Sequence, residues 1–126
     1  MAFIHRHRVR YVECDMQGVM HNSHYLAVVD DAVDVWTRPL VPVMEEAGWD
    51  FMVKRVEFTW HAPARVGDEL VSALQLRRWG TTSFEVAVEA SVNDVPCFSA
   101  LLTYVGVDRV DYRPMSVPAS VRDGLG

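Results

Sequence analysis

The sequence predicts an α+β fold, in which a curled antiparallel sheet of five strands wraps around one long helix. Three observations support this prediction: five segments alternate apolar and polar residues, one long segment has helical spacing, and the connections after that segment are short. Short connections favour antiparallel neighbours, and a single mostly apolar helix needs a sheet to cover it. Because the chain has 126 residues and 50% of them are hydrophobic, we expect residues 1–126 to form one domain.

The chain before the helix is predicted to form one strand and one loop. Residues 3–12 alternate with a period of two, which is typical of a strand. The polar segment 13–23 follows; it contains Gly18 and is expected to be a loop. Asn22 or Ser23 is the candidate N-cap, because either side chain can accept a hydrogen bond from the first helical N–H groups.

The long helix begins where the period changes. From Tyr25 to Trp36 the apolar residues follow the i, i+3, i+4, i+7 spacing of one helical face. Pro39 is expected to end this helix, because proline lacks the N–H that a helix interior requires. A shorter helix is predicted over 43–47, with Gly48 as its C-terminal cap.

The remainder of the chain is predicted to be almost entirely strand. Four segments carry the pattern of strands: 55–60, 70–79, 84–92 and 97–107. A turn is expected over 63–68, and Asn93-Asp94 is predicted to make a short hairpin turn. Segment 97–107 is apolar at both odd and even positions, as in a strand buried on both faces. The tail after Asp108 is expected to be irregular. Such a sheet has an outer face and edges to protect, which predicts a homodimer or homotetramer.

Composition excludes several classes of function. The net charge of −5 argues against nucleic acid as a partner, because binding phosphates needs a basic field. No apolar run approaches the roughly 20 residues that cross a bilayer, and the N-terminus lacks a signal-peptide pattern, so we expect a cytoplasmic protein without a membrane partner. Cys14 and Cys97 fit no metal-ligand spacing and are expected to be reduced, and no metal is expected.

The segment before the helix carries the chemistry. Asp15 follows the first strand, Gly18 comes three residues later, and the helix starts soon after. The N–H groups of a helix start could stabilise an oxyanion, and a nearby carboxylate could activate water or attack a carbonyl. Gly18 would let the loop bring both parts together. The same spacing also fits an aspartate that caps the loop and a glycine that serves a turn, and spacing alone leaves both interpretations open.

The segment from Tyr11 to Leu26 resembles the motif of the 4-hydroxybenzoyl-CoA thioesterase family in the hotdog superfamily. That motif has an aromatic residue, an acidic residue, Asp-x-x-Gly, an apolar pair and a late tyrosine that opens the helix. The residues that match it are Tyr11, Glu13, Asp15, Gly18, Val19, Met20 and Tyr25. Segments 63–70, 78–83 and 113–118 look like later turns and the tail of the same family, so the resemblance covers nearly the whole chain.

The resemblance implies a hotdog thioesterase that hydrolyses acyl-CoA to a free acid and coenzyme A. Asp15 would be the general base or nucleophile, and the backbone N–H of Asn22 would be the oxyanion donor. The family implies dimers joined through the sheet, often assembled into tetramers, with the site at the dimer interface and no metal or organic cofactor. His24 stands where the family often has asparagine, so the register of the helix cap is open by one residue.

Further residues are candidates for binding the substrate: Gly18, His21, Ser23, His24, Tyr25, Thr59, His61 and Arg78. His21 and His24 fit exposed loop histidines equally well, and Arg78, with Arg65 and Arg77, could hold the phosphates of coenzyme A or simply be solvated. His5 and His7 are interpreted as structural or surface residues and Cys14 as a buried cysteine. Two rival functions are an acyl-carrier-protein thioesterase and a module that binds acyl-CoA without hydrolysing it; a charge at Asp15 argues against the second.

Overall fold

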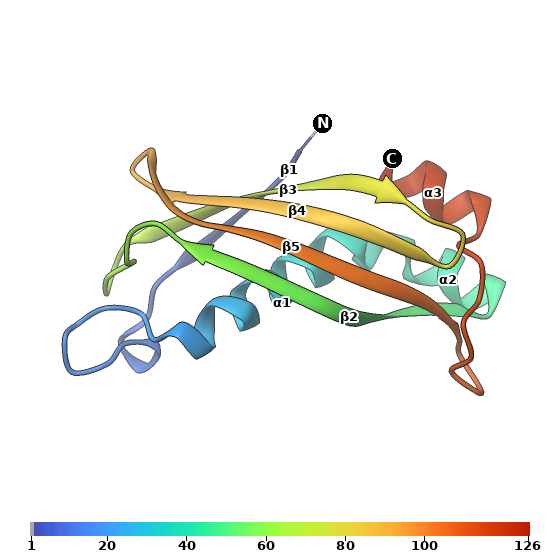
Figure 1. Cartoon of the computed structure of the whole chain (residues 1–126), viewed down its shortest axis with the longest axis horizontal. Coiled ribbons are helices and arrows are strands. Elements are labelled where there is room, and N and C mark those ends of the chain that lie inside the picture. Colours follow the sequence, from blue (N-terminus) through green and yellow to red (C-terminus); the bar gives the residue numbers. More distant parts are fainter. Residues whose placement is uncertain (1) are drawn as a thin grey trace.

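The computed structural model describes residues 2–126 and contains one antiparallel sheet with a long helix across one of its faces (Figure 1). The strands are β1 (Phe3–Arg8), β2 (Trp49–Trp60), β3 (Glu69–Trp79), β4 (Ser83–Val92) and β5 (Val95–Asp108). The helices are the 3₁₀ helix η1 (Tyr11–Glu13), α1 (Asn22–Thr37), the 3₁₀ helix η2 (Arg38–Leu40), α2 (Val41–Ala47) and α3 (Ala119–Leu125). The predicted α+β architecture is confirmed.

The sheet has the order β1-β3-β4-β5-β2, so β1 and β2 are its edges. Strands β3, β4 and β5 follow one another through short turns, as predicted. Asn93 and Asp94 both have positive φ, +49° and +66°, which is the backbone of the two-residue turn that matches the twist of a hairpin.

The core lies between α1 and the sheet. The buried stripe of α1 consists of Tyr25, Val28, Val29, Ala32 and Val33. Strands β4 and β5 oppose it with alternating buried residues: Phe84, Val86, Val88, Ala90, Phe98, Ala100, Leu102 and Tyr104. Periodicity predicted both sets because it reflects which face of each element is buried.

Four boundaries differ from the prediction. The first strand ends at Arg8 instead of residue 12, because η1 starts a turn at Tyr11 that the Glu13 side chain caps. The helical N-cap is His21, not Asn22 or Ser23. Pro39 does not stop the helical path, because it lies in the first turn of η2, where a missing N–H needs no partner. Strand β2 begins at Trp49, well before residue 55.

Two expectations for the C-terminal part are also corrected. On β5 only the residues that face α1 are fully buried, and those on the opposite face are partly exposed. The tail is not wholly irregular, because it ends in α3, which buries Val121 and Leu125. Within residues 2–126, no helix has both the length and the apolar character needed to cross a bilayer.

Candidate active site

Asp15 lies in a tight turn that closes a short two-stranded ribbon. The Asp15 N–H donates to the Val19 carbonyl at 3.0 Å, and the Gly18 N–H donates to the Asp15 carbonyl at 3.0 Å. The Gln17 N–H donates to Asp15 Oδ1 at 2.8 Å. Gly18 has φ +76°, a conformation that costs other residues energy, so glycine is required by the turn. The Asp15 side chain itself is exposed.

The connection between β2 and β3 holds this ribbon from one side. The Met20 N–H donates to the Ala64 carbonyl at 2.8 Å, and Val19 forms an antiparallel bridge with Arg65. The Ala64 N–H in turn donates to the Tyr25 hydroxyl at 3.2 Å. Figure 1 shows the loop before α1 and the β2–β3 connection at the same end of the molecule.

The start of α1 leaves one N–H group available. His21 caps the helix: its Nδ1 accepts the Ser23 N–H at 3.2 Å, and its carbonyl accepts the His24 N–H at 3.0 Å. The His21 N–H donates to the Glu13 carbonyl at 2.9 Å. Among the residues that the structure describes, the Asn22 N–H has no hydrogen-bond partner. It therefore points the positive end of the helix dipole at whatever lies in front of it.

A cavity of about 270 Å³ opens beside this helix start. Its lining comes from the ribbon, the first turn of α1 and the end of β2: Val19, Met20, Asn22, Tyr25, Trp60, His61, Ala62 and Pro63. The Trp60 and Tyr25 rings meet edge to face at 6.0 Å, and Trp60 stacks on Phe58 at 5.1 Å. Burial raises the pKa of the Tyr25 phenol, so this hydroxyl is neutral in the pH range of most enzymes.

The structure brings most of the predicted site residues together at this end of the molecule. Asn22, Tyr25 and His61 line the cavity, while Asp15 and Gly18 form the adjacent turn and His21, Ser23 and His24 the cap of α1. His61 Nε2 lies 3.0 Å from Ser99 Oγ, which donates to Glu89 Oε2 at 2.6 Å.

Two predicted residues lie elsewhere. Thr59 alternates with Trp60 along β2, so it points to the face of the sheet opposite the cavity. Arg78 lies at the far end of β3, near α3, whereas the site is near the start of that strand (Figure 1). Within one chain neither residue joins the others.

The lining also includes residues that sequence reasoning did not propose. Trp60 was interpreted as core or interface, yet it is 44% exposed and forms a wall of the cavity. A signal was present, because alternation in β2 places Phe58 and Trp60 on one face at the end that leads into the turn over 63–68. The two cysteines form no disulfide. Partial burial and neighbouring carboxylates raise the pKa of Cys14, which makes it a poor nucleophile.

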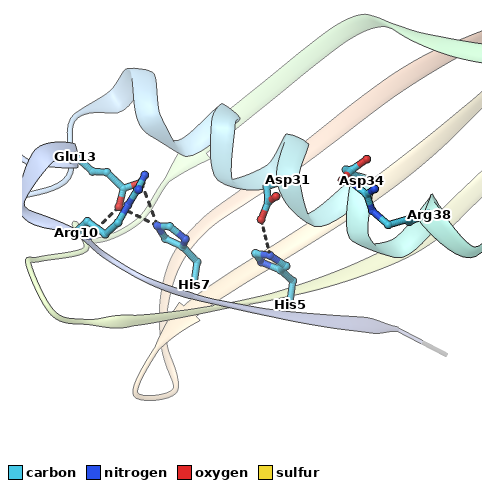
Figure 2. Close-up of polar contacts among 7 residues, drawn as sticks. All are labelled: His5, His7, Arg10, Glu13, Asp31, Asp34 and Arg38. Carbon is cyan, nitrogen blue, oxygen red and sulfur yellow. Dashed lines mark hydrogen bonds and ion pairs between the residues drawn. The ribbon is translucent and has the colours of Figure 1, made fainter.

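A buried carboxylate lies behind the ribbon. Glu13 is 3% exposed, and His7 Nε2 lies 2.9 Å and 3.1 Å from its two oxygens. Farther along α1, His5 Nε2 lies 3.1 Å from Asp31 Oδ2 (Figure 2). Both histidines that sequence reasoning assigned to structural or surface roles thus contact carboxylates. Across residues 2–126 there is no group of three or more His, Cys, Asp or Glu side chains arranged to hold a metal ion.

Comparison with known proteins identifies relatives along most of the chain. The model of a family described as the thioesterase-like superfamily matches residues 9–125. An uncharacterized acyl-CoA thioester hydrolase of Zymomonas mobilis is 38% identical over 66 residues, which cover 48% of this chain and 44% of that protein. A 1,4-dihydroxy-2-naphthoyl-CoA hydrolase of Synechococcus is 27% identical over 122 residues, covering 90% and 82%.

The chain therefore spans less than half the length of the first of these relatives. Among solved structures, a hypothetical protein of Staphylococcus aureus, crystallised in complex with CoA, superimposes with a TM-score of 0.89. It is 15% identical, and the match covers 98% of this chain and 81% of that one. At this identity the likeness concerns the fold, and it confirms the predicted hotdog arrangement of sheet and helix.

Proposed function

Because this chain belongs to the thioesterase-like superfamily, we propose that it hydrolyses acyl-CoA thioesters to a free acid and coenzyme A. The observation that carries the proposal is the unpaired Asn22 N–H at the rim of a cavity, beside the turn that presents Asp15. Thioester hydrolase is also the class named for both curated relatives. The finer assignment to the 4-hydroxybenzoyl-CoA family is part of the proposal and is supported by the motif from Tyr11 to Tyr25.

The proposed reaction uses the helix start as an oxyanion hole. The thioester carbonyl oxygen accepts the Asn22 N–H, and the helix dipole stabilises the negative charge that develops there. Asp15 removes a proton from an attacking water, or attacks the carbonyl carbon itself to form an anhydride that water then hydrolyses. The C–S bond breaks, the thiolate of coenzyme A takes up a proton, and the acid is released. No metal or organic cofactor is required.

The cavity wall suits a planar acyl group. Trp60 and Tyr25 offer ring surfaces, and Phe58 stacks behind Trp60. The Synechococcus relative is named for a bicyclic aromatic acyl-CoA. We therefore propose an aromatic acyl-CoA as the preferred substrate class.

We also propose that the protein acts in the cytoplasm as a homodimer or homotetramer. The edge strand β2 leaves one side of its backbone unpaired and exposes the apolar side chains of Met52, Val53 and Trp60. A second copy would cover that edge and close the open side of the cavity.

The test is thiol release from a panel of short, long and aromatic acyl-CoAs, with native protein and Asp15→Asn. We expect turnover by the native protein and a loss of about 10²–10⁴ in rate for the variant, because a general base or nucleophile is removed. Asp111→Asn is the matched control: this exposed aspartate lies in the loop after β5, at the opposite end of the molecule, and should keep full activity.

Each rival function has its own result in the same assay. Release of thiol from acyl-carrier protein but from no acyl-CoA would replace the substrate and keep the reaction. Tight acyl-CoA binding without thiol release would establish a binding module and refute the proposal. Full activity of Asp15→Asn would keep the reaction and refute the assigned residue.

A further inference from the structure

Glu13 is a buried carboxylate that the proposed reaction does not use. It is 3% exposed, and an ionised carboxylate removed from water is costly unless other groups compensate it. Its place in the chain is informative, because Asp15 follows two residues later.

The compensation comes from two directions. The Arg10 backbone N–H donates to Glu13 Oε1 at 2.8 Å, and the Arg10 guanidinium lies 3.5 Å from Oε2. From β1, the His7 ring donates to the same carboxylate (Figure 2). Burial by itself would raise the pKa of Glu13, but these hydrogen bonds and the charge of His7 outweigh it and lower the pKa.

The backbone of Glu13 is the root of the ribbon that carries the site. Its carbonyl accepts the His21 N–H at 2.9 Å, and the next pair along the ribbon is the bridge between Cys14 and Met20. One arm runs from this root to Asp15, and the other runs through His21 to the N–H of Asn22. A movement of the root would therefore change the separation of the two groups that act on the thioester.

We propose that Glu13 and His7 are positioning residues, whose buried pair fixes the root of the ribbon and so sets the carboxylate of Asp15 against the N–H of Asn22. This inference rests on the proposed function, since it assigns Asp15 and Asn22 to the reaction. Chemistry of this kind depends on placement, because a displacement of about 1 Å can cost a factor of about 10² in rate.

The molecule contains a natural control for this pair. His5 and Asp31 also join β1 to a carboxylate through a histidine ring, at 3.1 Å, and Figure 2 shows them farther along the same helix. Asp31 is 63% exposed in its side chain, and neither residue touches the ribbon. Removing this pair perturbs the contact between β1 and α1 but leaves the root in place.

The experiment compares Glu13→Gln with Asp31→Asn, using the acyl-CoA that the native protein turns over best. Both variants are assayed well below their own Tm. Glutamine keeps an oxygen for the Arg10 N–H but loses the charge that His7 contacts. We expect kcat of Glu13→Gln to fall by about 10- to 100-fold with little change in KM, because placement and not binding is lost. Asp31→Asn should keep the native kcat.

His7 provides a second, independent variant. His7→Gln retains an N–H donor for the carboxylate, whereas His7→Leu has none, so His7→Gln should keep more of the native kcat. If Glu13→Gln fails to fold, this pair decides the question. A lowered Tm with native kcat in the Glu13 and His7→Leu variants would overturn the positioning role while leaving the proposed function intact.

Hydrogen exchange supplies a readout that does not depend on activity. Amides of residues 14–24 should exchange faster in Glu13→Gln than in the native protein, and at the native rate in Asp31→Asn. If the native protein releases no thiol, the proposed function fails, and unchanged exchange over 14–24 in Glu13→Gln would then refute the anchoring as well.

Discussion

Glu13 and Asp15 are two carboxylates separated by one residue, and the fold treats them in opposite ways. Glu13 is buried, and His7 and Arg10 occupy its oxygens. Asp15 is exposed, and within residues 2–126 its carboxylate accepts only the Gln17 N–H. An ionised carboxylate offers about four acceptor positions, so Asp15 retains most of its capacity for water or substrate. The difference separates two tasks: the first carboxylate holds the loop, and the second is left available for chemistry.

The sharpest way to break this comparison is to remove each carboxylate and measure stability. Glu13→Ala leaves the His7 ring and the Arg10 N–H without their acceptor in a buried place, so the free energy of unfolding should fall by about 3–5 kcal/mol. Asp15→Ala loses one exposed hydrogen bond and should cost about 0.5–1.5 kcal/mol. Urea unfolding followed by tryptophan fluorescence measures both, and equal losses would contradict the division of tasks.

Tyr25 tests the opposite side of the same ribbon with a smaller expected effect. Its hydroxyl, in a residue that is 1% exposed, accepts the Ala64 N–H at 3.2 Å, and the Ala64 carbonyl holds Met20. Tyr25→Phe leaves a buried N–H without an acceptor and should lower the free energy of unfolding by about 1–3 kcal/mol.

Tyr112→Phe is the control for this substitution, because Tyr112 is 63% exposed. It should leave the free energy of unfolding within about 0.5 kcal/mol of the native value. A Tyr25 variant as stable as this control would show that the ribbon is held from the Glu13 side alone.

Much of the fold could be predicted because burial leaves a period in the sequence. The stripe of α1 and the alternation of β4 are direct records of which face meets the core. The end of β1 could not be predicted in this way, because it depends on a hydrogen bond between the Glu13 side chain and Arg10, in a stretch that still alternates. Helix α3 was missed because its two buried residues, Val121 and Leu125, follow a proline-rich stretch and are too few to define a period.

The site was predictable where chemistry and backbone coincide. Gly18 marks a turn with positive φ, and the turn puts Asp15 beside the helix start. Arg78 and Thr59 were chosen by their closeness in sequence to turns and strand ends. Strand length carries Arg78 to the far end of β3, and alternation turns Thr59 to the other face of the sheet. The roles of Asp15 and Asn22 in catalysis stay predictions for the assays above.

The pH dependence of stability gives the finest test of the buried carboxylate. Because the fold lowers the pKa of Glu13 from its ordinary value of 4.5, the unfolded chain takes up a proton there before the native protein does. The stabilisation by Glu13 is therefore fully present above pH 4.5 and declines as the pH falls through the lowered pKa of the native state. The Glu13→Gln variant has no proton to take up at this position, while the other titratable groups around the same cavity, His7, Arg8, Arg10 and Asp31, are common to both proteins. The free energy of unfolding of native protein should thus exceed that of the variant at pH 7, and the gap should narrow progressively below pH 4.5 as a protonated Glu13 comes to resemble glutamine. Urea titrations at a series of pH values measure the gap directly, and a gap that is constant down to pH 3 would mean that the ionised form of Glu13 contributes nothing to holding the loop.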